Sequence, residues 1–415
     1  MGASLATVLA VFGALLLAAV LLDSFASKIR VPGILLVLVL GLLTDNNLDA
    51  VPGEPLPLLS LSRAEAVAQV ALVLVLFFGG LTTNWRRVRS ILRPATRLAT
   101  AGSLITALLL MVVVLGFQQL PGSEIPASLP LALFVGAMVC STDASAVLAM
   151  LRPLSDRLPL RLLALIEVES AVNDPVAVVF SGLALAMAGG GTTAPSGLVI
   201  DVVRQFLLGG MLGLVGGSVA QFLLARHRGK AGPSVLAVMS LAELLLLVGV
   251  TELLGGSGLL AAFIAGLVLG NSPEGDQPAL EEAHAGFTKM AELLLFLCMG
   301  LVVDPNEVVQ TFGWALALFL AMLLARWLMV QGMLVNAGYS QAEKLFVGMA
   351  GLRGAVPIAM AIQAAASGVP WGHLMPPLAL GVVLLGLLGQ GFALVPLARR
   401  LGLTTPPPEL AMPGS

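Results

Sequence analysis

Charged residues are scarce in this chain, and their scarcity excludes most classes of protein. Only 11% of the 415 residues are charged and 58% are hydrophobic, and the mean hydropathy is +1.01. A soluble domain carries about a quarter of its residues as charges. A chain with so few charges cannot cover its apolar surface in water. The composition therefore predicts a polytopic membrane protein, with the lipid bilayer as its surroundings.

Cysteine and histidine are also scarce. The two cysteines, Cys140 and Cys298, fall in apolar segments far apart in the sequence. This placement favours packing roles over a disulfide or a metal site. The three histidines show no metal-ligand spacing. We therefore expect no resident cofactor, and we expect no nucleic-acid partner.

The apolar segments have the length of membrane-spanning helices. They run to roughly 18–25 residues without period-2 alternation, which favours helices over barrel strands. Counting them predicts an all-α protein of about thirteen transmembrane helices, with short helices near 31–44 and 257–270. Residues 1–400 form one membrane domain in this interpretation, and residues 401–415 form a short tail.

The basic residues are distributed unevenly between alternate loops. Most of the 21 lysines and arginines fall on one side, as Arg152, Arg157 and Arg161 do, whereas Arg63 and Arg204 fall on the other. Cytoplasmic loops carry the excess of basic residues in membrane proteins. We expect a multi-pass protein of the plasma membrane (the inner membrane in a bacterium), with the N-terminus outside and the C-terminus in the cytoplasm.

A few ionisable residues remain inside the predicted spans. Such residues are costly in the bilayer and commonly mark ion or proton pathways. The alternative is a structural ion pair that joins two helices, and for Glu243, Glu292 and Arg326, which stand alone in sequence, this alternative is equally good. The full set is Asp143, Glu169, Asp174, Glu243, Glu292, Arg326 and Arg353.

The segment CSTDASA, residues 140–146, interrupts the fifth apolar span with polar side chains. Serine, threonine and aspartate compete for backbone hydrogen bonds and can unwind a helix locally. Unwound segments in the middle of the membrane expose carbonyl oxygens that transporters use to coordinate cations. The alternative is a polar kink that neighbouring helices stabilise.

The segment ESAVNDPVAVV, residues 169–179, places two acids in the sixth span. On a helix, Ser170 and Asp174 share one face, and Glu169 and Asn173 share the neighbouring face. We expect one acid to face a water-filled cavity and the other to hold a structural partner. Pro175 removes a backbone donor and frees a carbonyl one turn earlier.

The segment GLRGAVP, residues 351–357, carries an arginine between glycines in the twelfth span. Its guanidinium cannot shed a proton, so Arg353 requires a partner, and we predict Glu169. The flanking glycines favour close approach and unwinding. Two broken helices seven spans apart are typical of transporters built from inverted repeats.

Four segments together resemble one family. STDASAVLAML, ESAVNDPVAVV, GSGLLAAFIAGLVLGN and GLRGAVPI are similar to the NhaP-type monovalent cation/proton antiporters, which include bacterial potassium/proton antiporters and, more distantly, animal sodium/proton exchangers. The resemblance covers nearly the whole chain. It implies an NhaA-like antiporter fold, with broken helices crossing in the middle of the membrane and with core and dimerisation subdomains. It also implies a homodimer.

The resemblance also implies roles for individual residues. Asp174 corresponds to the carboxylate that binds a cation and a proton alternately, and Thr142, Asp143 and Ser170 correspond to positions that line or support this site. We expect a Na⁺ or K⁺ ion to bind at Asp174, Thr142 and Ser170. Asn173 stands where the electrogenic branch has a second aspartate, so the expected exchange is electroneutral, one cation for one proton.

The resemblance implies a supporting ion pair between Glu169 and Arg353. The chain departs from the family at Phe78, where many relatives carry an acid before the glycine pair of the third span. This departure leaves the choice of cation open. The sequence also leaves open a sodium-coupled symporter of organic anions. A channel and an intramembrane aspartyl protease fit the motifs less well, and we do not expect an enzyme.

Overall fold

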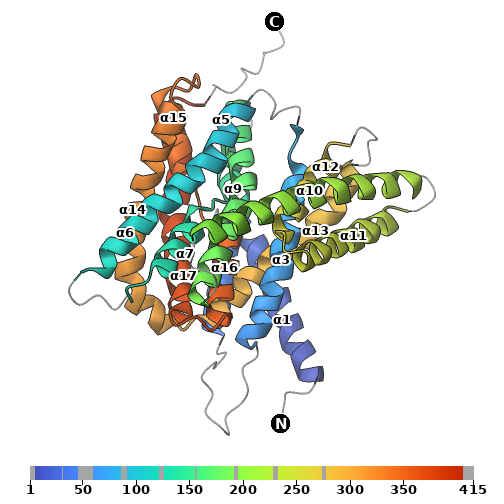
Figure 1. The fold of residues 1–415 in the computed structure, drawn as a ribbon, viewed down its shortest axis with the longest axis horizontal. Coiled ribbons are helices and arrows are strands. Elements are labelled where there is room, and N and C mark those ends of the chain that lie inside the picture. The colour runs from blue at the N-terminus through green and yellow to red at the C-terminus, as the bar shows by residue number, and fades with distance from the viewer. Residues whose placement is uncertain are drawn as a thin grey trace, which may run out of the picture.

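The computed structural model describes residues 5–29, 31–44, 59–85, 91–120, 126–154, 157–190, 195–227, 232–272 and 277–404. Within these ranges the chain forms helices and no strand (Figure 1). The prediction of an all-α membrane protein is confirmed. The predicted tail lies outside the described residues beyond position 404, as do the basic segments 86–90 and 228–230 that contributed to the predicted orientation.

Ten stretches of helix are long and apolar enough to cross a bilayer within the described residues. Three shorter apolar helices add to them, and two of these match the short spans that the sequence predicts. The total of thirteen membrane crossings stays a prediction. The long stretches are α1 (Leu5–Ile29), α3 (Leu61–Thr82), α5–η1–α6 (Leu92–Arg97, Leu98–Gly102, Ser103–Gln118), α7–α8–η2 (Leu129–Cys140, Ala144–Leu151, Arg152–Leu154), α9 (Leu160–Ala188), α10 (Pro195–His227), α11 (Pro233–Leu253), α13 (Gln277–Val302), α14 (Pro305–Met333) and η3–α17–η4–α18 (Gly372–Leu374, Met375–Leu385, Gly386–Gly391, Phe392–Arg400). The shorter helices are α2 (Gly33–Leu43), α12 (Gly258–Gly270) and α16 (Ala355–Ala366), and a polar half-helix, α15 (Gln341–Met349), precedes α16.

Both predicted helix breaks are present. The chain leaves helical geometry at 141–143, between α7 and α8, and again at 351–354, between α15 and α16. The two breaks touch, because the Asp143 amide donates a 2.8 Å hydrogen bond to the Leu352 carbonyl. Two interrupted helices that meet at their breaks form the crossed arrangement that the sequence predicts.

The helices fall into two groups by their contacts. Helices α6, α7, α14 and α17 pack together, and so do α3, α10, α12 and α13. In Figure 1 the first group lies on the left and the second on the right, with α9 and α16 between them. The division into core and dimerisation subdomains stays a prediction.

Glycines allow the backbones of α3 and α12 to approach closely. A Cβ at Gly80 would collide with the Phe263 carbonyl, and a Cβ at Gly266 would collide with the Phe77 carbonyl. Small residues allow such close backbone contact between membrane helices. The contact fixes the position of α3, whose Phe78 lines the cavity described below.

Candidate functional site

Asp174 lies next to the break in the α7–α8 helix. It comes from the middle of α9, one residue before Pro175, and its side chain is buried. One carboxylate oxygen, Oδ1, accepts a 2.5 Å hydrogen bond from the Ser141 hydroxyl. Asp174 forms no ion pair with any residue that the structure describes. Its described polar contact is therefore with a neutral hydroxyl.

Asn173 binds the unwound segment from the same helix. Its amide nitrogen donates to Thr142 Oγ1 over 2.8 Å, and its amide oxygen accepts from the Thr142 backbone over 3.4 Å. The Thr142 hydroxyl also pairs with Ser170 Oγ at 2.9 Å. Two hydrogen bonds from one amide hold Thr142 in its non-helical conformation beside Asp174.

The predicted ion pair between Glu169 and Arg353 is wrong. Glu169 instead pairs with Arg326 of α14, and the two side chains form a bidentate contact with N–O distances of 2.8 and 3.0 Å. Both side chains are buried. Arg326 is therefore a structural partner, which is the alternative that the sequence left open for it.

The guanidinium groups of the two arginines lie at the ends of different helices, and the carbonyl oxygens of those ends are their partners. Arg326 also donates to the carbonyls of Val347 and Gly348, in the last turn of α15. Arg353 donates over 2.6 Å to the carbonyl of Val139, near the end of α7, and to its neighbour Gly351. The last carbonyls of a helix lack partners within that helix, and a cation there is favoured by the helix dipole. Arg353 thus satisfies backbone oxygens where the sequence predicted a carboxylate.

Asp143 provides the opposite charge at a helix start. Its carboxylate caps α8 by accepting from the Ala146 amide over 3.1 Å. It also lies against Gly354, the residue before α16, where a Cβ would collide with the carboxylate. Helix N-termini favour negative charge. The arginine side chains therefore lie at the C-terminal ends of α7 and α15, and Asp143 lies beside the N-terminal ends of α8 and α16.

The predicted ion-binding residues line one cavity of about 1040 Å³. Asp174, Thr142, Asp143 and Ser170 all border it, together with Ser141. Asn173, Glu169 and Arg353 are fully buried behind this surface and do not border it. The structure thus brings the predicted ligands together and places the supporting residues behind them. The role of Ser141 was missed, although it lies in the polar segment that predicts the break.

Two further acids of the membrane segments have different positions. Glu292 of α13 borders the same cavity as Asp174. Glu243 lies apart on α11, and its buried Oε2 has no hydrogen-bond partner among the described residues. These two acids are equivalent by sequence pattern, but of the two only Glu292 borders the cavity of the candidate site, as does Glu167 of α9.

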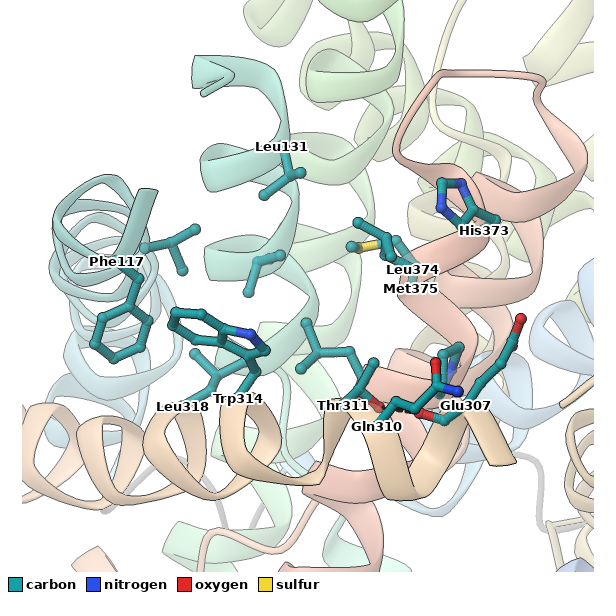
Figure 2. Close-up of a pocket in the computed structure, with 14 residues that line it drawn as sticks. Phe117, Leu131, Glu307, Gln310, Thr311, Trp314, Leu318, His373, Leu374 and Met375 are labelled. Atoms are coloured by element: carbon teal, nitrogen blue, oxygen red, sulfur yellow. Dashed lines mark hydrogen bonds between the residues drawn. The ribbon is translucent and has the colours of Figure 1, made fainter. Parts of the chain in front are cut away.

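A second cavity of about 990 Å³ lies away from this site (Figure 2). Phe117 and Trp314 form a ring contact with a centroid separation of 5.4 Å at one end, and Glu307, Gln310 and Thr311 follow α14 toward the other. It contains none of the predicted site residues. Its acid, Glu307, is exposed near the start of α14, whereas Asp174 is buried beside the two helix breaks, so the Asp174 cavity is the better candidate site.

The fold and the site together define a class of protein. Helices that are broken in the middle of the membrane and meet around buried polar groups are the arrangement of secondary transporters. The sequence matches the family described as "Sodium/hydrogen exchanger, transmembrane" over residues 12–400. The chain belongs to this family, and the resemblance drawn from the motifs is confirmed.

Individual relatives agree with this placement. The chain is 33% identical over 408 residues to the K(+)/H(+) antiporter NhaP2 of Shewanella sp. (strain MR-4), which covers 96% of this chain and 68% of that protein. It is 30% identical to the K(+)/H(+) antiporter NhaP of Alkalimonas amylolytica, over 97% of this chain and 69% of that protein. Both relatives are named as transporters and not as enzymes.

A solved structure supports the fold. The sodium proton antiporter MjNhaP1 from Methanocaldococcus jannaschii matches with a TM-score of 0.81 at 22% identity, covering 96% of this chain and 99% of that one. At this identity the match concerns the fold alone. The antiporter fold that the resemblance implies is therefore confirmed.

Proposed function

We propose that this protein exchanges a monovalent cation, Na⁺ or K⁺, for H⁺ across the membrane, with the two ions competing for Asp174. The family and the names of the relatives support cation/proton antiport. The observation that carries the proposal is the position of Asp174, a buried carboxylate among hydroxyl groups at the crossing of two broken helices. No resident cofactor is required.

The proposed cation ligands are oxygen atoms. The Asp174 carboxylate supplies the charge, and the hydroxyls of Thr142 and Ser170 supply neutral oxygens, with Asp143 beside them. Hard cations such as Na⁺ and K⁺ prefer such oxygen donors. A proton on Asp174 removes the charge that the cation requires. Cation and proton therefore exclude one another at this group, and alternating access converts the exclusion into exchange.

The cavity supplies an aqueous path to one side of the membrane. A larger cavity of about 1440 Å³ shares Ser145 with the candidate site and extends to Arg152 and Lys289. Both basic residues belong to the side that the positive-inside rule assigns to the cytoplasm. We infer an inward-facing arrangement, in a plasma-membrane protein with its N-terminus outside.

The proposed stoichiometry is one cation for one proton. Asn173 is an amide whose hydrogen bonds hold Thr142, so it adds no titratable group at the crossing. With one exchanging carboxylate, no net charge crosses the membrane in a cycle. Proteoliposomes under an imposed membrane potential, without an ion gradient, are expected to show no transport. Potential-driven transport would contradict the electroneutral proposal.

The proposal for Asp174 is tested by Asp174→Asn in proteoliposomes loaded with a pH-sensitive dye. Adding NaCl or KCl is expected to release protons in the parent and to give no signal in the variant. Asp304→Asn is a matched control, because Asp304 is an exposed cap of α14 remote from the cavity and asparagine also caps helices. Exchange retained by a folded Asp174→Asn protein would remove Asp174 from the mechanism.

We also propose a homodimer, which the resemblance to the antiporter family implies. Helices α10 and α11 expose large apolar side chains, among them Leu207, Met211, Phe222 and Leu246. Lipid or a second copy of the chain can cover such a face. Cysteine pairs introduced on α10 are expected to cross-link two copies in native membranes. The absence of a cross-link at every α10 position would count against a dimer through this face.

A further inference from the structure

Glu292 stands where two cavities meet. The cavity of Asp174 and the larger cavity that reaches Asp23 and Lys289 have two charged or hydroxyl-bearing residues in common, Glu292 and Ser145. These two side chains therefore lie on the boundary between the larger cavity and the cavity of Asp174. This position is independent of the contacts that define the Asp174 site.

The two oxygens of the Glu292 carboxylate face different neighbours. Oε1 lies 3.5 Å from the Ser145 hydroxyl, which donates a 2.6 Å hydrogen bond to Asp143. Oε2 lies 3.9 Å from Lys289 Nζ, one turn earlier on the same face of α13. One oxygen is thus directed toward the candidate site and the other toward the larger cavity.

Lys289 is held more closely by a different helix. Its ammonium group lies 2.9 Å from Asp23 Oδ1 of α1, and its side chain is 44% exposed. The contact with Glu292 is longer than a hydrogen bond and allows a small cation to replace the ammonium there. An ammonium and a K⁺ ion carry the same charge, so they compete for one carboxylate.

We propose that Glu292 determines the apparent affinity for the transported cation, and that Lys289 is a tethered cation that competes with the ion at this carboxylate. The inference rests on the proposed exchange at Asp174 and adds a selecting step before it. Glu292 takes the cation from the larger cavity and passes it toward Asp174, while Lys289 stays on Asp23. Phe78 lines the same cavity without a charge.

The two residues should have opposite effects on the KM for the cation. Glu292→Gln removes a negative charge from the path and should raise KM by about tenfold with kcat changed by less than about twofold, a size expected for one charge acting over about 12 Å at an effective dielectric constant near 20. Lys289→Gln removes the competitor and should lower KM by about threefold. Arg204→Gln, from the exposed pair with Asp201 at 3.2 Å, is the control for charge removal and should leave KM unchanged.

A rescue experiment separates this role from a purely structural one. Phe78→Glu in the Glu292→Gln background places a carboxylate in the same cavity and should return KM to within about threefold of the parent value. If these charges served only to hold α1 against α13, Glu292→Gln and Lys289→Gln would both lower thermal stability and change KM in the same direction. Equal signs, or no rescue, would overturn the proposal.

The affinity can also be measured without transport. Cation binding raises the melting temperature of the solubilised protein by mass action, so the KCl or NaCl concentration for half-maximal stabilisation measures affinity directly. It should rise about tenfold in Glu292→Gln and fall in Lys289→Gln. Unchanged values in both variants, together with loss of exchange in Asp174→Asn, would reject the role of Glu292 and leave the proposed function intact. Exchange that survives Asp174→Asn would reject the proposed function itself.

Discussion

Replacing Glu169 by leucine leaves the Arg326 guanidinium buried without its carboxylate, in a site where both side chains are almost fully inaccessible. Arginine cannot release its proton to escape this situation. Removing one partner of a buried, hydrogen-bonded ion pair costs about 3–5 kcal/mol. Arg326→Leu should cost a similar amount, because it leaves Glu169 alone and withdraws the donors from the carbonyls of Val347 and Gly348.

The double variant Glu169→Leu/Arg326→Leu should be less unstable than the sum of the two single variants. Independent effects would add to about 6–10 kcal/mol. The double variant leaves no buried charge at these two positions, and what remains is mainly the two helix-end carbonyls, at about 1–3 kcal/mol each. We therefore expect a loss of about 2–6 kcal/mol, and a coupling energy of a few kcal/mol between the two positions.

The free energies can be measured by unfolding in mixed detergent–SDS micelles, followed by tryptophan fluorescence. Arg204→Leu provides the matched control, because Arg204 pairs with Asp201 while the two side chains are 54% and 39% exposed. Such exposed pairs contribute about 1 kcal/mol or less. Additive effects of Glu169→Leu and Arg326→Leu, or a stronger coupling of Glu169 to Arg353 than to Arg326, would refute this reasoning.

Three further predictions concern the crossing itself. Gly354→Ala places a Cβ against the Asp143 carboxylate. We expect it to abolish exchange in a flux assay, while a surface-expression blot shows that the protein still reaches the membrane. Normal flux would contradict the close contact. Asn173→Ala removes both hydrogen bonds to Thr142 and should lower the free energy of unfolding by about 1–3 kcal/mol in the same unfolding assay. Asn173→Ser is the milder comparison. A free energy of unfolding equal to that of the parent would show that the amide is dispensable. If proton and cation compete for Asp174 as proposed, lowering the pH on the cation side should raise the apparent KM without lowering the rate at saturating cation. A pure loss of maximal rate would exclude competition.

The helix breaks were predictable because their causes are local. A run of serine, threonine and aspartate around Asp143, and glycines on both sides of Arg353, weaken helical hydrogen bonding wherever they occur. The faces of α9 were likewise predictable in part, since the helical period alone places Ser170 and Asp174 together. These features depend on neighbours within one or two turns, and the sequence contains those neighbours.

The partner of Glu169 was not predictable in the same way. Two arginines, Arg326 and Arg353, were available inside the membrane, and the motif around Arg353 favoured it. The choice depends on the rotation and depth of α14 relative to α9, which no local pattern encodes. It also depends on the end of α15, whose carbonyls attract Arg326. The sequence does not show which backbone oxygens become free at a helix break. For that reason the sequence predicts a carboxylate, and not backbone carbonyls, as the partner of Arg353.

The arrangement of charges at the crossing explains how Asp174 can remain available. The other charged groups there have polar partners, since Arg326 and Arg353 donate to carbonyls at the ends of α15 and α7, although Arg353 Nη2 has no hydrogen-bond partner among the described residues. Glu169 neutralises Arg326, and Asp143 caps α8. A helix start that lacked its acid would attract another one, and an arginine that lacked acceptors would attract the nearest carboxylate, because unpaired buried groups cost about 1–3 kcal/mol each. Asp174 is spared this demand and meets a hydroxyl instead of an arginine. In the proposed exchange, a permanent ion pair at Asp174 would exclude both the cation and the proton, and neither buried arginine forms such a pair with Asp174 among the described residues.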